Sequence, residues 1–349
     1  PTVHTIGTSC RSQPMLHPDF SANNLKKDIE KYINLAVAPS TKQTYSSGEK
    51  RFVEFILLVK RTQVEQCLPA TESMLTEFVV YLARTIKHSS IKNYLAAVRH
   101  YHIRQGFKLN FQKMTRLQLV LRGIKRAQGG QIRIRLPITI HHLQLFHLLL
   151  SIPSTKNYDS LMFWAAMTLA FFGFLRLGEL TCNSKFNTDT HLTPDNISFN
   201  FIQETQKPKS MTILIKESKT DPFRVGQTIT IGSTSSPLCP VLAMKRYLTS
   251  RKSLNGPLFV HASGKPLTKQ ALITETRSLL TKSGLNAAHY AGHSYRIGAA
   301  TTAASAELPS WLIKTLGRWT SDCYERYIKI PLSTLSGVSA TLTDVLTAK

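Results

Sequence analysis

The sequence predicts a mainly α protein of two helical domains, the second of which also holds a small antiparallel β-sheet. Apolar residues recur at helical spacing through most of the chain. One segment, SMTILIKESKTDPFRVGQTITI, instead alternates β-branched and polar residues on either side of a turn-forming centre, which is typical of a hairpin. The length of 349 residues suffices for two domains, and the 42% hydrophobic content suffices for their cores.

The first half of the chain is predicted to be an arm followed by one helical domain. Residues 1–22 lack periodicity and are expected to form a flexible arm. Residues 23–128 show four or more helical patterns, which we assign to a single domain. A helix in APSTKQTYSSGEKRF is expected to start with a cap at Ser40 or Thr41, and one in TESMLTEFVVYLART with a cap at Thr71.

The second half is predicted to be a linker, a mostly helical domain and a tail. Residues 129–140, GGQIRIRLPITI, combine paired glycines, alternating arginines and a proline, which indicates an extended linker. The second domain spans 141–331, and its apolar run at 161–175 is too short to cross a bilayer and is expected to be a buried helix. The predicted hairpin and further helices, including one in SDCYERYI, follow this run. Residues 332–349 form the tail.

The charge of the chain is strongly positive and unevenly spread. Lys and Arg number 44 against 20 Asp and Glu, for a net charge of +24. So much charge repels itself unless a polyanion neutralises it, which indicates nucleic acid or an anionic membrane surface as partner. No acidic residue occurs between Glu77 and Asp159, whereas a merely solvated surface normally mixes both signs, so phosphate contact is favoured.

Cysteine usage and the chain start also restrict the class of protein. The five cysteines are scattered and form no C-x-x-C pair, which argues for a reducing, intracellular compartment and against a zinc site or a disulfide framework. This sequence shows no signal-peptide pattern, so we expect none to act here. Because the sequence begins at Pro1 rather than Met, we expect a processed product or a piece of a longer protein.

Residues that can carry chemistry follow one another through the second domain. In chain order they are Arg176, Glu179, Lys219, His293, Arg296, Trp319 and Tyr327. Arginine forks bind phosphate oxygens at two points and offset charge that grows in a transition state. A tyrosine can attack phosphorus once its proton is taken, and a lysine can protonate the departing oxygen. Each residue alone is more readily explained by a structural role, but their order and spacing together suit phosphoryl transfer at a DNA diester.

The motifs around these residues resemble those of the tyrosine recombinase and integrase family. That family orders an arginine, a hairpin lysine, His-x-x-Arg, His or Trp, and tyrosine, as RLGEL, SKTD, GHSYRIGAA, LGRW and YERYI do here. GHSYRIGAA is similar to the catalytic box of Cre-like recombinases, and the N-terminal domain, opening APSTKQTY, resembles the core-binding domain. The resemblance covers residues 25–330. GRW and YERYI are most similar to recombinases of eukaryotic mobile elements such as DIRS-like retrotransposons and Cryptons.

The resemblance implies a site-specific recombinase that cuts and rejoins DNA through a 3′-phosphotyrosyl bond and needs neither a metal nor a cofactor. By position, Arg176 and Arg296 would clamp the scissile phosphate, and Glu179 would orient Arg176. Trp319 would donate its indole N–H to a phosphate oxygen.

The resemblance also implies the residues that move protons and attack. Lys219 would be the general acid for the 5′ oxygen, His293 would assist proton transfer with the nucleophile, and Tyr327 would be the nucleophile. Tyr324 is the alternative nucleophile, because the spacing from Trp319 to Tyr327 is slightly shorter than in the family. The two tyrosines are almost a helical turn apart, so only one can face the site, and the YI followed by a basic residue favours Tyr327.

The partners implied are double-stranded DNA and further copies of the chain, with a dimer on each site and a tetramer in synapsis. The tail is expected to dock on a neighbouring protomer, and a mobile-element origin would place the protein in the nucleus, without membrane attachment. The basic residues expected to contact DNA are Lys87, Lys92, Arg99, Arg122, Lys125, Arg126, Arg133 and Arg135.

Three other functions remain open from the sequence. A domesticated DNA-binding protein without catalysis would show the same charge and fold, although all the catalytic residue types are present. A type IB topoisomerase would use similar chemistry without sequence preference. A non-enzymatic nucleic-acid or membrane-surface binder would explain the charge but not the ordered residues.

Overall fold

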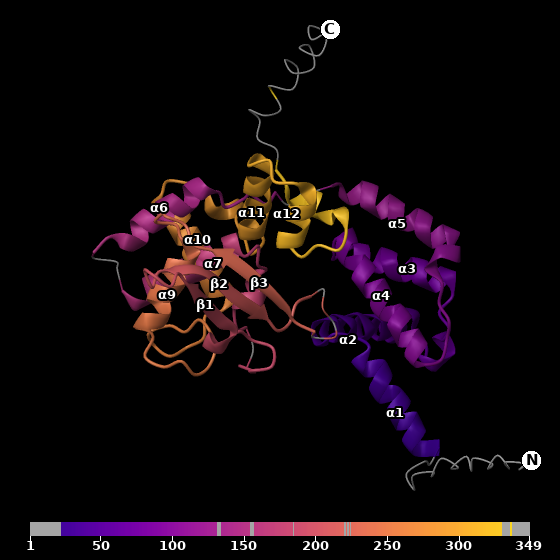
Figure 1. Ribbon diagram of the computed structural model, residues 1–349. Helices are drawn as coiled ribbons and strands as arrows, with labels where there is room; N and C mark the ends of the chain where they lie inside the picture. The colour runs from indigo at the N-terminus through magenta and orange to yellow at the C-terminus, as the bar shows by residue number, and fades with distance from the viewer. Residues whose placement is uncertain are drawn as a thin grey trace, which may run out of the picture. The chain divides into compact units, whose positions relative to one another are not determined.

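The computed structural model describes residues 22–130, 134–153, 157–183, 185–219, 221, 223, 225–329 and 336. The chain divides between residues 132 and 133 into two compact units, and this division lies inside the segment 129–140. The prediction of a mainly α fold with a small antiparallel sheet is confirmed (Figure 1). None of the described helices is both long and apolar enough to cross a membrane.

Five α-helices are described in the first unit, and the last four of them pack around one apolar core. The five are α1 (Ala22–Leu35), α2 (Pro39–Glu54), α3 (Glu72–Ala83), α4 (His88–Arg104) and α5 (Thr115–Gln128). Helix α2 continues into a π-helical turn, η1 (Phe55–Lys60), and short 3₁₀ turns lie at Glu65–Cys67 and Phe111–Lys113. Phe52, Phe55 and Phe78 are almost fully buried in this core, and the Phe78 ring contacts the rings of both Phe52 and Phe55.

The two caps predicted for this unit have different outcomes. The cap at Ser40 or Thr41 is wrong: α2 begins at Pro39, and its preceding residue makes no side-chain cap. Proline fits the first turn of a helix because its missing N–H would have no partner there. The cap at Thr71 is confirmed, since its hydroxyl accepts a hydrogen bond from the Met74 N–H at 3.3 Å.

Among its described residues, the second unit combines seven α-helices and a three-stranded sheet in one apolar core. The helices are α6 (Ile140–Ser151), α7 (Tyr158–Phe172), α8 (Leu177–Leu180), α9 (Pro240–Ser250), α10 (Lys269–Lys282), α11 (Ser294–Ser305) and α12 (Ser310–Leu316). Short 3₁₀ turns are η4 (Pro194–Asn196), η5 (Ala287–His289) and η6 (Asp322–Tyr327). Helix α7 is the buried apolar helix that the sequence predicts. The α-helix expected in SDCYERYI is instead the 3₁₀ turn η6.

The sheet consists of β1 (Ile197–Phe201), β2 (Pro208–Ile215) and β3 (Gln227–Gly232), in that order and antiparallel (Figure 1). The hairpin of β2 and β3 is confirmed, whereas β1 was not predicted. Alternate residues of β2, namely Met211, Ile213 and Ile215, are buried in the core of the unit. This core therefore fixes the register of the hairpin.

The chain from residue 134 to α6 lies against the second unit as an extended strap. Its Leu136 N–H donates to the carbonyl of His289, and its Ile138 N–H to the carbonyl of Ser294. Ile138 is fully buried, and a Cβ added to Gly298 of α11 would lie 1.7 Å from the Ile138 oxygen. Glycine at 298 is therefore required for the close approach of strap and helix.

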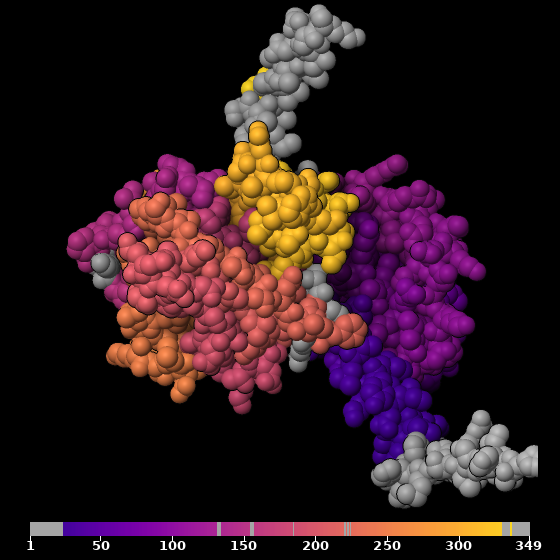
Figure 2. Space-filling view, in the orientation of Figure 1, coloured from indigo at the N-terminus to yellow at the C-terminus, as the bar shows by residue number. Residues whose placement is uncertain are grey.

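The described residues from α11 to η6 form one compact cap on the second unit, at the yellow end of the colour scale in Figure 2. Helix α11 packs against α7, α12 and η6. Because α11 is Ala- and Gly-rich (SYRIGAATTAAS), its backbone can approach these neighbours closely. The candidate site lies where these elements meet.

Candidate active site

Arg296 is the central buried cation of the second unit. Its side chain is fully buried on α11, and its guanidinium donates to the carbonyls of Phe174, at 2.7 Å, and Gly317. These carbonyls lie at the C-terminal ends of α7 and α12, where the helix dipole places partial negative charge. Burial, followed by the charges of Arg176 and Arg318, lowers the pKa of Arg296 to about 10, so it stays protonated at neutral pH.

Both of these helix ends turn through residues with positive φ that are not glycine. Phe174 has φ of 51° and Arg318 has φ of 54°. At the end of α12, the backbone N–H of Arg318 donates to the carbonyl of Thr315, and that of Trp319 donates to the carbonyl of Lys314. These hydrogen bonds end the helix in a left-handed turn, a position that glycine usually occupies. A bulky residue in this conformation costs on the order of 1 kcal/mol, and such residues cluster at functional sites.

A buried carboxylate, Glu179, joins two arginines in this region. Its Oε1 accepts from Arg176 Nη1 at 2.8 Å, and its Oε2 accepts from the Arg176 backbone N–H at 2.9 Å and from Arg318 Nη2 at 2.7 Å. The side chains of Glu179 and Arg318 are only 4% and 3% exposed, whereas that of Arg176 is 18% exposed. Glu179 therefore binds both Arg176 and Arg318, and the contact with Arg318 was not predicted. The role of Glu179 in orienting Arg176 for catalysis stays a prediction.

The aromatic residues of the site stack around Arg296. The Arg296 guanidinium carbon lies 4.3 Å from the Trp319 ring centroid and 5.8 Å from that of Tyr327. Trp319 is buried, and its ring centroid lies 5.2 Å from that of Tyr327 and 6.1 Å from that of Tyr324. In this position Trp319 supports Arg296 by a cation–π contact. The role of its indole N–H stays a prediction.

The two candidate tyrosines have different surroundings. Tyr327 is half-buried, and its ring lies 6.3 Å from the His293 ring, centroid to centroid. Its backbone carbonyl accepts from the Thr301 hydroxyl at 3.2 Å, and that hydroxyl also accepts from the Lys329 N–H, so α11 holds the segment in place. Tyr324 is buried at 7% exposure and has a described ring contact with Trp319 only. The structure thus brings Tyr327, rather than Tyr324, to His293 and Arg296.

His293 precedes the first turn of α11 and is exposed, whereas Arg296, three residues later, is fully buried. Partial desolvation, followed by the positive charges of Lys269, Arg296, Arg176 and Arg135, lowers the pKa of His293. The imidazole is therefore neutral at physiological pH and can accept a proton.

Lys219 has no described contact with this cluster. It occupies the turn between β2 and β3, where Ser218 and Asp221 form an isolated bridge, and its side chain is exposed. Among the residues that the structure describes, no hydrogen bond or ion pair joins Lys219 to the other predicted site residues. Its role as general acid stays a prediction.

The basic residues predicted to contact DNA lie mainly in the first unit. Those at the surface of α4 and α5, or preceding α4, are Lys87, Lys92, Arg99, Arg122, Lys125 and Arg126. Gln128 joins the two helices, since it accepts from the His88 N–H at 2.6 Å and donates to the carbonyls of Ala83, at the end of α3, and Ile86. Partial burial and then Lys92 and Lys125 lower the pKa of His88, so both lysines lie close to it. Arg133 lies outside the described residues, and Arg135 belongs to the second unit.

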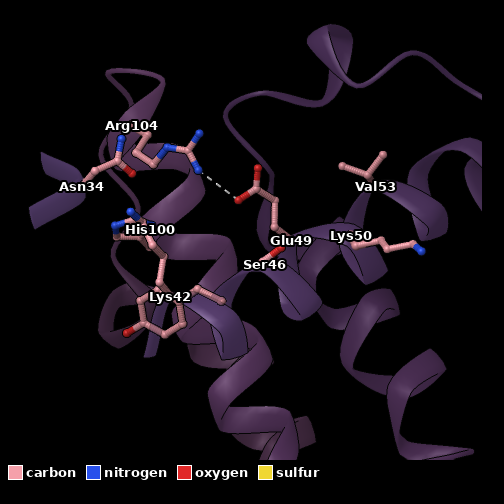
Figure 3. A pocket seen from close by; sticks show the side chains of 9 residues that line it. Asn34, Lys42, Ser46, Glu49, Lys50, Val53, His100 and Arg104 are labelled. Carbon is pink, nitrogen blue, oxygen red and sulfur yellow. Dashed lines mark hydrogen bonds and ion pairs between the residues drawn. The ribbon is translucent and has the colours of Figure 1, made fainter. Parts of the chain in front are cut away.

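A separate pocket in the first unit is lined by residues of α1, α2 and α4 (Figure 3). Within it Arg104 pairs with Glu49 at 3.1 Å, and the buried His100 Nε2 atom has no hydrogen bond to any residue that the structure describes. The pocket contains no predicted catalytic residue, and its charges have both signs. In the described part of the chain no cluster of His, Cys, Asp and Glu side chains could hold a metal ion.

This chain is similar to known proteins in sequence and in fold. No protein-family model matches the chain. An integrase/recombinase XerD homologue of Selenomonas ruminantium is 26% identical over 277 residues, which cover 75% of this chain and 74% of the relative. The fold is similar to that of XerH site-specific recombinase bound to palindromic difH substrate (TM-score 0.59, 16% identity, 92% of this chain and 85% of that one). It is also similar to that of the Tn1549 transposon integrase in complex with transposon right end DNA (TM-score 0.56, 14% identity, 91% and 99%).

Proposed function

Because the chain belongs to the tyrosine recombinase and integrase family, we propose that it cuts and rejoins DNA strands at specific sites through a covalent bond to Tyr327. The observation that carries this proposal is the position of the Tyr327 ring beside both His293 and the Arg296 guanidinium. This arrangement supports roles for Tyr327 as nucleophile, His293 as base and Arg296 as the cation that binds the phosphate, because the Tyr327 ring centroid lies 6.3 Å from that of His293 and 5.8 Å from the Arg296 guanidinium carbon.

In the proposed reaction the Tyr327 oxygen attacks the scissile phosphorus, and His293 takes up the phenol proton. The bond from phosphorus to the 5′ oxygen breaks, and that oxygen leaves with a proton from a general acid, the role expected of Lys219. The diester is exchanged for a phosphotyrosyl diester of similar energy. Attack by a 5′ hydroxyl therefore reverses the step, and religation needs no metal or nucleotide.

The arginines supply the binding and the charge that this reaction needs. Arg176 is the more accessible of the two clamp residues, and Glu179 holds it in place. The Nε–H of Arg296 is buried without a hydrogen-bond partner among the described residues. An unpaired buried donor is costly, so a phosphate oxygen that accepts from it would be bound favourably, most of all when negative charge grows in the transition state.

The assembly follows from the reaction. Recombination between two duplexes needs four strand cleavages, so we propose a dimer on each DNA site and a tetramer in synapsis, with the tail 332–349 docked on a neighbouring protomer. The exposed lysines and arginines of α4 and α5 would contact the duplex phosphates. An origin in a eukaryotic mobile element and action in the nucleus are further parts of this proposal.

Covalent capture tests the proposal without a known target. The protein is mixed with a library of nicked duplexes that trap covalent intermediates, and the DNA that stays attached in detergent is sequenced. We expect enriched sequences with the wild type and with Tyr324→Phe, and none with Tyr327→Phe.

The other outcomes of this experiment each contradict the proposal in a recognisable way. Capture that Tyr324→Phe abolishes and Tyr327→Phe does not would reassign the nucleophile. Tight, salt-sensitive binding without any attached DNA would indicate a DNA-binding protein without catalysis. Attached DNA without any enriched sequence would indicate a topoisomerase, which relaxation of a plasmid would then verify.

A further inference from the structure

An open depression lies directly beside His293 in the second unit. Its lining consists of Arg135, Asn183, Lys269, Gln270, Ile273, Arg277, Ala291, Gly292 and His293. All the charged residues in this set are basic, and no carboxylate is among them. The neutral polar members, Asn183 and Gln270, can donate hydrogen bonds from their amides. This composition favours a ligand that carries negative charge and many acceptor oxygens.

Hydrogen bonds within the protein hold the walls of the depression. Arg277 donates from both Nε and Nη2 to the Tyr290 carbonyl, at 3.0 and 2.9 Å. Asn183 accepts from the Lys269 N–H at 2.7 Å and donates to the Thr181 hydroxyl at 3.2 Å. The site is therefore formed before any ligand arrives, which lowers the entropy cost of binding.

Lys269 is the residue best placed to meet a ligand there. It begins α10, so the positive end of the helix dipole adds to its own charge. The Lys269 Cε atom lies 2.8 Å from the position that a Cβ on Gly292 would occupy. The aliphatic part of the Lys269 side chain therefore packs over Gly292, the residue before His293. Lys269 and Arg135 are also among the charges that lower the pKa of His293, which confirms that both lie near the imidazole.

We propose that this depression binds a second phosphate of the DNA strand, a neighbour of the scissile phosphate, through Lys269 and Arg135. This inference rests on the proposed function for the identity of the strand. One strand of DNA carries a phosphate for each 3.4 Å of helical rise, so a phosphate held between Arg176 and Tyr327 has close neighbours. His293 both lines the depression and contacts Tyr327. The depression therefore adjoins the site of the scissile phosphate and can hold one of the neighbouring phosphates.

The first test measures binding of the full chain to a duplex of random sequence at several salt concentrations. Replacing a lysine that contacts a phosphate lowers the salt slope of log K by about 1 and weakens binding equally for all sequences. We expect this for Lys269→Ala. Lys282→Ala is the matched control, because Lys282 is exposed and ends the same helix. Equal slopes for the two variants would overturn the inference, as would a loss that depends on the base sequence, which indicates a base contact.

The second test locates the phosphate. In a duplex recovered by covalent capture, single phosphates next to the cleaved one are replaced by uncharged methylphosphonate. One replacement should weaken binding by the wild type but have no further effect in Lys269→Ala. If each replacement weakens binding by the variant as much as by the wild type, the depression holds no phosphate.

The two tests separate this inference from the proposed function. Covalent capture together with an unchanged salt slope in Lys269→Ala would reject the second phosphate site alone. A lowered slope without covalent capture would leave a phosphate-binding depression and reject the recombinase.

Discussion

The buried ion pair of Arg318 and Glu179 should make Arg318→Met one of the most destabilising single substitutions in the second unit. The pair is 2.7 Å long, and both side chains are less than 5% exposed. Removing one partner of a buried pair costs about 3–5 kcal/mol, because the remaining charge stays buried. Glu179 keeps its two bonds to Arg176, so we expect the lower end of this range, about 3 kcal/mol. Methionine preserves most of the volume, so little of the loss comes from packing.

Tryptophan fluorescence during urea unfolding measures this loss selectively, because all three tryptophans, at 164, 311 and 319, lie in the second unit. The double variant Arg318→Met, Glu179→Gln should be more stable than Arg318→Met alone, since both charges of the pair are then absent. Lys314→Met is the control: its pair with Asp322 lies on the surface, where solvent screens the charges, so its loss should have little effect on stability. A loss for Arg318→Met no larger than for this control, or additive losses in the double variant, would refute the reasoning.

Two other predictions concern packing and pH. Gly298→Ala should lower the stability of the second unit by about 3 kcal/mol in the same assay, because its Cβ would lie 1.7 Å from the Ile138 oxygen; Gly178→Ala, which meets open space, should not destabilise. DNA cleavage should slow as pH falls through the lowered pKa of His293, because the protonated ring cannot accept a proton. Lys269→Ala removes a positive neighbour, so it should raise that pKa and move the acid limb of the rate profile to higher pH; an unmoved limb would contradict the role of His293.

Local patterns in the sequence were sufficient to predict most of the fold. Helix α7 and the β2–β3 hairpin follow from periodicity, which depends only on near neighbours. Strand β1 was missed because only five residues pair there and most of them are not buried, so its pattern is weak. The capping error at α2 came from weighing Ser40 and Thr41 above Pro39, which is itself a strong first-turn residue.

The site was predicted less completely, because its contacts join distant parts of the chain. Arg318 was missed since its partner Glu179 is 139 residues away, and nothing local in LGRW separates a buried arginine from an exposed one. The spacing of His293 and Arg296 predicted a shared helix face. It could not show that His293 lies at the exposed start of the helix while Arg296 is buried between two helix ends.

The identity of the residue that bonds to DNA tests the central claim most directly. Trypsin cleaves after Arg326, which separates Tyr324, in WTSDCYER, from Tyr327, in YIK. After covalent capture and nuclease digestion, mass spectrometry of the tryptic peptides should find the residual nucleotide on Tyr327, in YIK or in the longer peptide left if the adduct blocks cleavage. A nucleotide on Tyr324, or on no tyrosine at all, would contradict the account.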